Sequence, residues 1–309
     1  MAERRKSQLL EDTPLKLVIG CGYLGTRVAA AWRDAGHTVA VVTRSPERAE
    51  SFAAQGFTPI VADVLNPPSL QKLPRAETVL YAVGFDPAAG HSRHRVYVGG
   101  LLNVLEALSD DAPAPPDKII YISSTGVYGD IDGDVTEQSP CDPTRDGGRA
   151  CLEAECMLAA HPFGSRRVVL RLAGIYGPDR VPNRQALLDG DPIVAAPDSR
   201  LNLIHVEDAC RAVLAADALA EPPSLYLVSD GNPPLRSEYY AEAARLLGAP
   251  APKLQWPPTQ GEPQTTTGRT RGDSAKIIRN DKLLHELKVQ LAYPDFRAGL
   301  LQAILGQTD

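Results

Sequence analysis

The sequence of 309 residues has no apolar run of the roughly 20 residues that a membrane-spanning helix needs. Its first dozen residues, MAERRKSQLLED, lack the apolar core of a signal peptide. We therefore expect a flexible amino terminus over residues 1–14 and a cytoplasmic protein. A long basic run is also absent and the net charge is −6. Nucleic acid and membrane are thus not expected as partners.

Paired or clustered cysteines are missing as well. The chain has five cysteines, an odd number, without a CxxC pair or the spacing of a zinc site. This pattern indicates reduced thiols and predicts no metal site. Apolar residues make up 43% of the chain and charged residues 23%, which is ordinary for a globular protein.

Short β-branched runs alternate with helical patterns over most of the chain. Strands are expected within residues 15–25, 37–45, 58–64, 77–84, 118–124, 166–177 and 224–230, and helices within 26–36, 46–56, 96–110, 148–161 and 206–219. This alternation predicts an α/β fold, a Rossmann-type doubly wound parallel sheet with a small discontinuous C-terminal substrate lobe.

The expected division is a cofactor-binding Rossmann domain of residues 15–178 plus 201–231 and a smaller lobe of 179–200 plus 232–309. Residues 255–275 are rich in Pro, Gly and Thr and predict a long surface loop. Its Arg269 and Arg271 could reach an anionic substrate, although flexible surface charge is the plainer reading.

The segment GCGYLG matches the dinucleotide fingerprint G-x-G-x-x-G, and it follows an expected strand and opens an expected helix. In such a loop the first glycine allows a tight turn, the second admits the pyrophosphate and the third allows close helix–strand packing. Backbone N–H groups and the helix dipole hold the negative charge. The predicted cofactor contacts here are Gly20, Gly22, Tyr23, Leu24 and Gly25.

The end of the second strand favours NADP(H) over NAD(H). An NAD site places Asp or Glu there to accept from the ribose 2′-hydroxyl. This chain instead has Thr43, Arg44 and Ser45, with Arg48 one helical turn later. An arginine can bind a 2′-phosphate with two hydrogen bonds. The alternative is that Arg44 is only a solvated surface charge.

Two further segments complete a predicted cofactor track. Asp63 and Val64 follow the third strand, where an acid can meet the adenine amino group. Ala82, Val83 and Gly84 end the fourth strand, where small residues let the chain pass close to a cofactor.

The segments GCGYLG, ADV, NVLEA, YISSTGVYGD, RLAGIYGP and NLIHVEDACRAVLAA occur in the order in which the extended short-chain dehydrogenase/reductase superfamily has them. The chain resembles the NAD-dependent epimerase/dehydratase type of that superfamily, and its tail resembles the atypical YeeZ-like subgroup. The resemblance implies a small-molecule substrate, a homodimer and cofactor contacts from Leu172 and Gly174.

The resemblance also implies a catalytic set that this chain lacks in part. Ser124 matches the family position that binds the substrate carbonyl, and Thr125 lies beside it. The family's tyrosine and its lysine four residues later are replaced by Gly147 and Cys151. Tyr128 is a candidate substitute proton donor, although a VYG tyrosine is also part of the shared strand-end motif.

Other polar residues could face a substrate. We predict Tyr176, Arg171 and His205 as substrate contacts, against the alternatives of packing, an ion pair and a hydrogen bond to backbone. Tyr97 could face the same site, although a tyrosine on an amphipathic helix is more often a core residue.

Two functions fit these motifs. One is an NADP(H)-dependent oxidoreductase or epimerase-like enzyme, acting on a carbonyl, alcohol or nucleotide-sugar-like substrate with a non-standard proton donor. The other is a non-catalytic NADP(H)-binding redox sensor or partner-binding module on a degenerate enzyme scaffold. A methyltransferase is disfavoured because Thr43 and Arg44 stand where it would have an acid.

Overall fold

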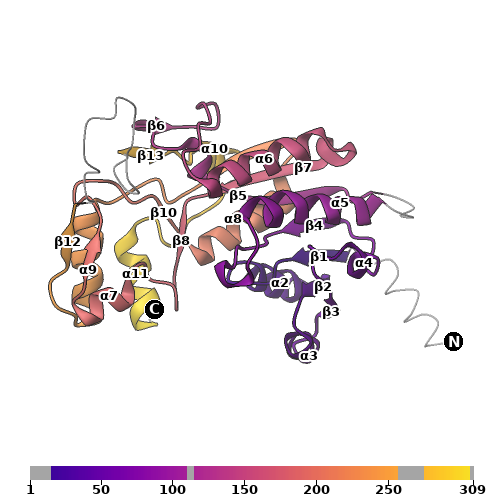
Figure 1. Cartoon of the computed structure of the whole chain (residues 1–309), viewed down its shortest axis with the longest axis horizontal. Coiled ribbons are helices and arrows are strands. Elements are labelled where there is room, and N and C mark those ends of the chain that lie inside the picture. Colours follow the sequence, from indigo (N-terminus) through magenta and orange to yellow (C-terminus); the bar gives the residue numbers. More distant parts are fainter. Residues whose placement is uncertain (1–14, 110–114, 257–274, 307–309) are drawn as a thin grey trace. The chain divides into compact units, whose positions relative to one another are not determined.

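The computed structural model describes residues 15–109, 115–256 and 275–306. Its main feature is a seven-stranded sheet of order β11-β7-β5-β4-β1-β2-β3 (Figure 1). The strands are β1 (Leu15–Ile19), β2 (Thr38–Thr43), β3 (Thr58–Val61), β4 (Thr78–Tyr81), β5 (Lys118–Ser124), β7 (Arg167–Leu172) and β11 (Ser224–Val228). The sheet is parallel and helices flank it, so the predicted fold class is confirmed.

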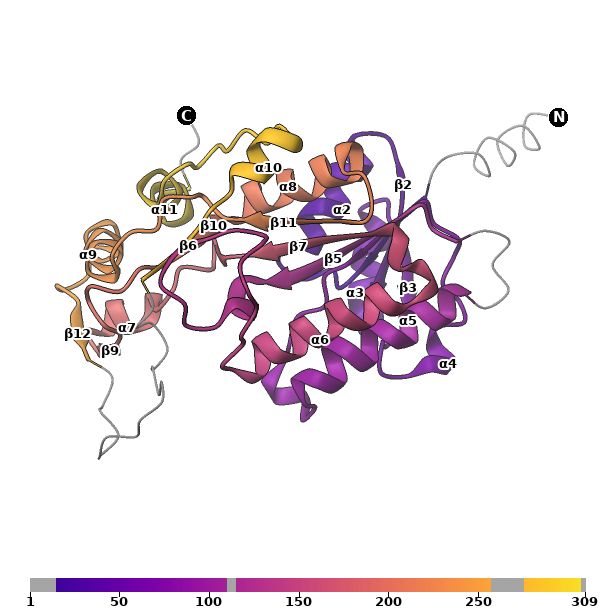
Figure 2. The ribbon, with the colours of Figure 1, turned by 90° about the horizontal axis from the view of Figure 1, so that it is seen from above.

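The strands form where the sequence is rich in β-branched residues, and the side chains on both faces of these strands are buried. In β1 and β2 every residue after the first is buried, as expected for a parallel sheet covered on both sides. The covering helices include α2 (Gly25–Asp34), α3 (Pro46–Ala54), α4 (Pro67–Leu70), α5 (Gly100–Ser109), α6 (Asp146–Ala160) and α8 (Val206–Leu219). Figure 2 shows α5 and α6 side by side along one face of the sheet.

The strand order places a binding crevice at a definite point. The chain builds β1, β2 and β3 toward one edge and then returns to place β4 on the other side of β1. At such a reversal the loops after the two strands diverge and leave a crevice at the carboxyl ends of the strands. The glycine loop follows β1 and the Ala82–Gly84 segment follows β4, so both border this crevice.

Three two-stranded pairs join distant parts of the sequence. They are β6 (Gly133–Val135) with β13 (Lys276–Ile278), β8 (Gly174–Tyr176) with β10 (Leu203–His205), and β9 (Pro192–Val194) with β12 (Lys253–Gln255). The single strand expected within 166–177 is therefore wrong. It is two strands, because β8 leaves the main sheet to pair with β10.

The remaining helices have six to twelve residues, and the turns are shorter. They are α7 (Arg184–Asp189), α9 (Arg236–Leu247), α10 (Asp281–Glu286), α11 (Phe296–Leu305), the 3₁₀ turns η1 (Pro87–Ala89), η3 (Thr125–Tyr128) and η4 (Pro162–Arg166), and a π-helical turn, η2 (Arg95–Gly99).

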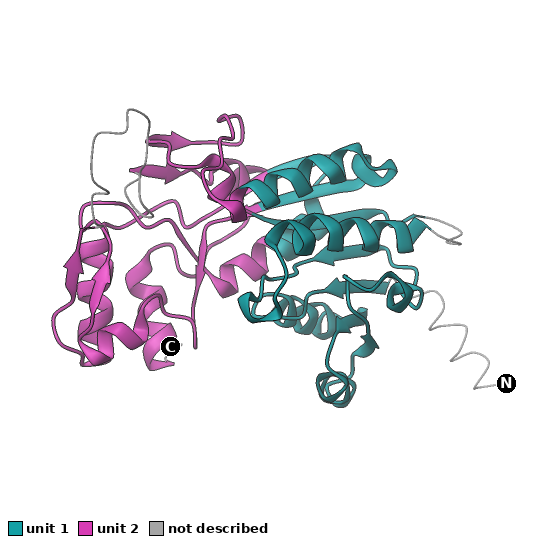
Figure 3. Cartoon of the chain, viewed as in Figure 1, with its two compact units in different colours: residues 1–123, 149–170, 213–225 teal, residues 124–148, 171–212, 226–309 magenta. Residues whose placement is uncertain are grey.

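The chain forms two compact units (Figure 3). Unit 1 comprises residues 1–123, 149–170 and 213–225, and unit 2 comprises 124–148, 171–212 and 226–309. The sequence-based division into 15–178 plus 201–231 and 179–200 plus 232–309 follows sheet membership and stays a prediction. The expected flexible terminus 1–14 and most of the loop 255–275, with Arg269 and Arg271, lie outside the described residues.

Candidate functional site

The loop between β1 and α2 has the backbone of a phosphate cradle. Gly20 has a φ of +98°, and a Cβ on it would lie 2.5 Å from the backbone of Ala82. A Cβ on Gly25 would collide with the carbonyl oxygen of Gly20. A Cβ on Gly22 would meet nothing within 4 Å. The turn itself thus requires the outer glycines, whereas the middle one faces open space that fits a pyrophosphate.

A cavity of about 270 Å³ lies at this loop, wholly within unit 1. Nine predicted cofactor residues line it: Gly20, Gly22, Thr43, Arg44, Arg48, Asp63, Val64, Val83 and Gly84. Ile19, Cys21, Val42, Ala62, Leu65, Asp86, Ala89, His91 and Val96 complete the lining. The residues chosen from four separate sequence segments therefore meet around one hollow at the carboxyl ends of β1, β2 and β4.

Two arginines give the cavity positive charge. The guanidinium of Arg48 donates to the carbonyl oxygen of Cys21 at 2.5 Å, which holds the glycine loop against α3. Arg44 has a more open position, with its side chain 58% exposed and 3.9 Å from the carboxylate of Asp86. An exposed pair at this distance is weak, so Arg44 can turn to another anion. Ser45 instead caps α3, since its hydroxyl accepts from the N–H of Arg48 at 3.1 Å.

The acidic residues of the cavity lie after β3 and β4. The carboxylate of Asp63 accepts from the N–H of Leu65 at 2.9 Å. Asp86 caps η1 by accepting from the N–H of Ala88 at 3.0 Å. Sequence reasoning missed Asp86 and His91 because both lie in a loop with no motif. The sequence pointed to Asp86 only through its place two residues after Gly84, which is a predicted cofactor contact.

Ser124, the predicted carbonyl-binding residue, ends β5 and begins η3. Its hydroxyl oxygen accepts from the N–H of Gly126 at 3.0 Å, which fixes the side chain and leaves its O–H free to donate. Thr125 is buried. The local turn therefore suits Ser124 for orienting an acceptor group.

Tyr128, the predicted substitute proton donor, is a buried phenol. It is 1% exposed, and its hydroxyl accepts from the guanidinium of Arg171 at 2.7 Å. Burial raises the pKa of Tyr128 to about 12, although Arg171 acts to lower it. Arg171 is itself buried. The pair forms a packed interaction in unit 2, and the catalytic role of Tyr128 and the substrate role of Arg171 stay predictions.

The start of α6 carries the replaced family positions. Gly147 has no side chain, and Cys151 is buried with its pKa raised to about 11, chiefly by burial. Nearby, the hydroxyl of Ser123 donates to the buried carboxylate of Glu155 at 2.5 Å. These two positions therefore supply neither a phenol nor an ammonium.

Tyr176 and His205 are fully buried in unit 2. Their rings are 5.2 Å apart, and a Cβ on Gly299 of α11 would collide with the Tyr176 hydroxyl. Nδ1 of His205 accepts from the N–H of Glu207 at 3.3 Å, so Nε2 carries the proton toward the Gln302 side chain at 3.1 Å. Both residues pack the core, and their substrate role stays a prediction without a contact to support it.

The remaining predicted residues do not line the cavity. Tyr23, Leu24, Gly25, Ser45 and Ala82 belong to the segments around it, whereas Leu172 and Gly174 lie in unit 2. Leu172 is buried, and Gly174 begins β8.

Among the described residues there is no cluster of His, Cys, Asp and Glu that could hold a metal ion. In the same part of the chain, no helix has both the length and the apolar character to cross a membrane.

Comparison with known proteins matches the chain to one family and several relatives. The model of the NAD dependent epimerase/dehydratase family matches residues 17–228. Protein YeeZ of Escherichia coli is 33% identical over 197 residues, which cover 63% of this chain and 65% of YeeZ, slightly less than two thirds of its length.

Two further relatives extend the comparison. The 4-hydroxy-2-methyl-3-oxo-4-farnesyl-3,4-dihydroquinoline-1-oxide ketoreductase of Stigmatella aurantiaca is 25% identical over 227 residues, covering 69% of this chain and 67% of that protein. A solved structure of a functionally unknown conserved protein from Silicibacter pomeroyi superposes with a TM-score of 0.75 at 27% identity. That match covers 96% of this chain and 100% of the other.

Proposed function

The chain belongs to the NAD dependent epimerase/dehydratase family, and we propose that it is an NADP(H)-dependent oxidoreductase of a small carbonyl or alcohol compound. The observation that carries this proposal is the cavity of unit 1. There an open glycine loop, the cationic Arg44 and Arg48, and the absence of an acid at the end of β2 occur together.

Different residues of the cavity would bind different parts of the cofactor. The N–H groups of the glycine loop and the start of α2 would hold the pyrophosphate. Arg44 would leave Asp86 for a 2′-phosphate, because a dianion offers more negative charge and more acceptor oxygens than one exposed carboxylate. Asp63 would meet the adenine. When bound, the nicotinamide supplies or accepts the hydride.

Substitution of Arg44 tests the choice of cofactor. We expect Arg44→Ala to weaken NADPH binding by about tenfold or more, as for loss of a charged hydrogen bond, and to change NADH binding by less than about twofold. Isothermal titration of both dinucleotides gives the two dissociation constants. Arg33→Ala, a surface arginine outside the cavity lining, is the matched control.

Wild-type protein that binds NADH more tightly than NADPH would contradict the proposal. If Arg44→Ala leaves the ratio of the NADPH and NADH dissociation constants unchanged, the cofactor preference comes from residues other than Arg44.

On the substrate side, Ser124 would donate its O–H to the carbonyl oxygen. A ketoreductase among the relatives supports a carbonyl substrate for this chain. More narrowly, the proposal includes a nucleotide-sugar-like compound as a substrate class and an epimerase-like reaction as an activity. A homodimer is the expected assembly.

A second candidate function is a non-catalytic NADP(H)-binding sensor. Gly147 and Cys151, together with the buried Tyr128–Arg171 pair, favour it, because none of these residues offers an accessible acid. Incubation with NADPH and a broad panel of aldehydes, ketones and nucleotide sugars separates the two. Oxidation of NADPH supports the enzyme, and tight binding without any oxidation supports the sensor.

A further inference from the structure

Asp86 lies in the loop after β4 and meets Arg44 from the opposite side of the cavity in unit 1. Strands β2 and β4 pair with opposite edges of β1, so their carboxyl ends border the glycine loop from its two sides. Arg44 directly follows β2, whereas Asp86 belongs to the segment after β4. Both residues line the cavity, and their charged groups are 3.9 Å apart. The pair therefore joins the two sides of the cavity.

The carboxylate of Asp86 has a fixed orientation. Its Oδ1 accepts from the N–H of Ala88 at 3.0 Å and so caps η1. The preceding residue, Phe85, packs its ring against the guanidinium of Arg93 at 4.0 Å, which anchors the start of the segment. The second oxygen of Asp86, Oδ2, is the one that faces Arg44. The cap thus holds one oxygen and leaves the other as an acceptor beside Arg44.

The 2′ position of the adenosine ribose differs chemically between the two dinucleotides. In NAD(H) it is a hydroxyl, which donates to a carboxylate. In NADP(H) it is a phosphate, which binds a guanidinium and repels a carboxylate. The end of β2 offers Thr43, Arg44 and Ser45 and no acid. Because Asp86 reaches Arg44 from another strand, a carboxylate and a guanidinium that suit the two 2′ groups lie side by side.

Asp63, the other carboxylate of the cavity lining, has a different setting. It follows β3, and its Oδ1 accepts from the N–H of Leu65 at 2.9 Å. Within the part of the chain that the structure describes, no ion pair joins it to Arg44 or Arg48. Asp86 is therefore the carboxylate of the lining that lies beside the arginine expected to bind a 2′-phosphate.

We propose that Asp86 is a specificity-determining residue for the cofactor, an assignment that rests on the NADP(H) site proposed above. Its Oδ2 accepts from the ribose 2′-hydroxyl of NAD(H), so Asp86 supplies from the loop after β4 the acid that the end of β2 lacks. With NADP(H), the 2′-phosphate displaces Asp86 from Arg44. Asp86 thus limits the preference for NADP(H) that Arg44 creates, and the site admits both dinucleotides.

The first test is isothermal titration of Asp86→Asn protein with both dinucleotides. Asparagine is as good an N-cap as aspartate, so this substitution keeps the cap of η1 and removes the charge. We expect NADH to bind at least about threefold more weakly, because a neutral amide oxygen is a weaker acceptor than a carboxylate. NADPH should bind at least about twofold more tightly, because Arg44 is released and the phosphate is no longer repelled.

Asp34→Asn is the matched control for the loss of charge. Asp34 also pairs with an arginine, Arg33, at 2.7 Å, but it ends α2 and does not line the cavity. Both carboxylates belong to unit 1, so a general effect of net charge would appear in both variants. We expect the ratio of the NADH and NADPH dissociation constants in Asp34→Asn to stay within about twofold of the wild-type ratio.

The second test locates the effect on the adenosine ribose. The probes are adenosine 2′,5′-bisphosphate and adenosine 5′-phosphate, which differ at the 2′ position and carry no nicotinamide. We expect Asp86→Asn to bind the first probe more tightly and the second more weakly than the wild type does. The changes should have the same signs as those for NADPH and NADH.

The outcomes separate the two proposals. The assignment of Asp86 is overturned, and the NADP(H) site stands, if Asp86→Asn leaves the ratio unchanged, if Asp34→Asn changes it equally, or if the two probes do not reproduce the effect. Loss of NADH affinity in Asp63→Asn but not in Asp86→Asn gives the ribose hydroxyl to Asp63 and also overturns the assignment. Wild-type protein that binds neither dinucleotide contradicts the proposed function itself.

Discussion

Asp230 shows at the scale of one residue how burial without a partner alters a carboxylic acid. One of its oxygens accepts from the N–H of Asn232 at 3.0 Å, whereas the other is buried and has no partner among the described residues. Burial raises the pKa of Asp230 to about 7, and the neighbouring Asp295 and Asp208 act in the same direction. Ionised Asp230 therefore costs the folded state free energy.

This pKa predicts a pH dependence of stability. An acid whose pKa is higher in the folded state binds its proton more tightly there, so stability is greatest at low pH. The contribution of Asp230 to the free energy of unfolding falls by at most about 4 kcal/mol as pH rises from about 4, its pKa in the unfolded chain, through about 7, its pKa in the folded protein. We expect Asp230→Asn to flatten this slope. Urea unfolding across that range measures it, and parallel curves for the variant and the wild type would contradict it.

At the scale of elements, the start of α6 depends on a glycine. A Cβ on Gly148 would collide with the carbonyl oxygen of Gly126 and lie 3.0 Å from Pro143. Helix α6 can begin at this point because Gly148 has no side chain, so its backbone can lie directly against the backbone of Gly126. Gly148 thus fixes how α6 passes the turn that follows Ser124.

Replacing this glycine tests the contact. Alanine in a helix ordinarily stabilises relative to glycine, but here we expect Gly148→Ala to lower the free energy of unfolding by about 1–3 kcal/mol, as overpacking does. Gly99→Ala, where a Cβ would meet nothing within 4 Å, is the matched control. Chemical denaturation measures both, and equal stabilities of the two variants would contradict the predicted collision.

The strands of the main sheet, the glycine loop and half of the cavity lining were predictable because each depends on local sequence. Helix α8 follows the periodic segment 206–219 residue for residue. The π-helical turn was not predictable, since RVYVGG also fits a regular amphipathic helix. The exit of β8 from the main sheet was missed because it depends on β10, about 30 residues later. The burial of Tyr128 likewise depends on Arg171, which no local pattern places beside it.

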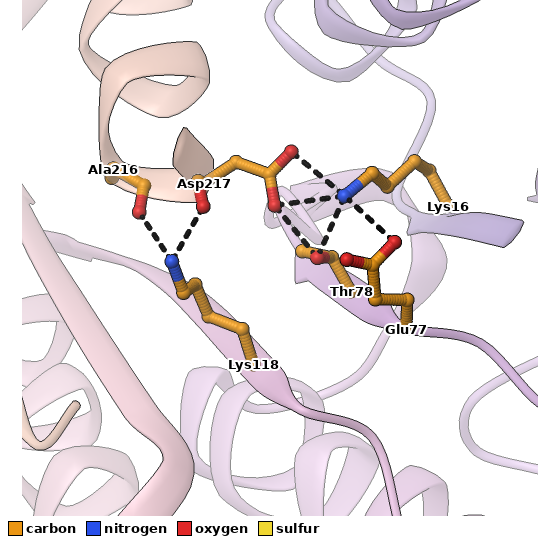
Figure 4. Close-up of polar contacts among 6 residues, drawn as sticks. All are labelled: Lys16, Glu77, Thr78, Lys118, Ala216 and Asp217. Atoms are coloured by element: carbon orange, nitrogen blue, oxygen red, sulfur yellow. Dashed lines mark hydrogen bonds and ion pairs between the residues drawn. The ribbon is translucent and has the colours of Figure 1, made fainter. Parts of the chain in front are cut away.

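At the scale of the whole molecule, a buried ionic cluster ties the sheet of unit 1 to the end of α8 (Figure 4). Lys16 of β1 is 4% exposed and lies 2.9 Å from Asp217, 3.4 Å from Glu77 and 3.1 Å from the hydroxyl of Thr78. Lys118 of β5 donates to the carbonyl oxygen of Ala216 at 3.0 Å. These groups gather at the amino ends of the strands, whereas the cavity lies at the carboxyl ends.

Breaking this ionic cluster should lower the free energy of unfolding and leave NADPH affinity unchanged. Asp217→Asn leaves Lys16 buried without its main counter-charge, so we expect a loss of about 3–5 kcal/mol of unfolding free energy. NADPH affinity should stay within about twofold, because the cavity is at the opposite strand ends. Asp34→Asn, which breaks the exposed pair with Arg33, should cost less than about 1 kcal/mol. A large loss of affinity in folded Asp217→Asn protein would contradict this separation.

The interleaving of the two units has a consequence for biosynthesis. The chain passes between them after residues 123, 148, 170, 212 and 225, so neither unit is a continuous segment. On the ribosome, unit 1 lacks its last segment until residue 225 has been made, and unit 2 lacks β13 and α11 until residues 276–305 have followed. The residues that line the dinucleotide cavity fall within residues 19–96, so they are all synthesised before the later segments of both units. A dinucleotide that binds this cavity would favour the folded chain over the unfolded one during synthesis as well as afterwards.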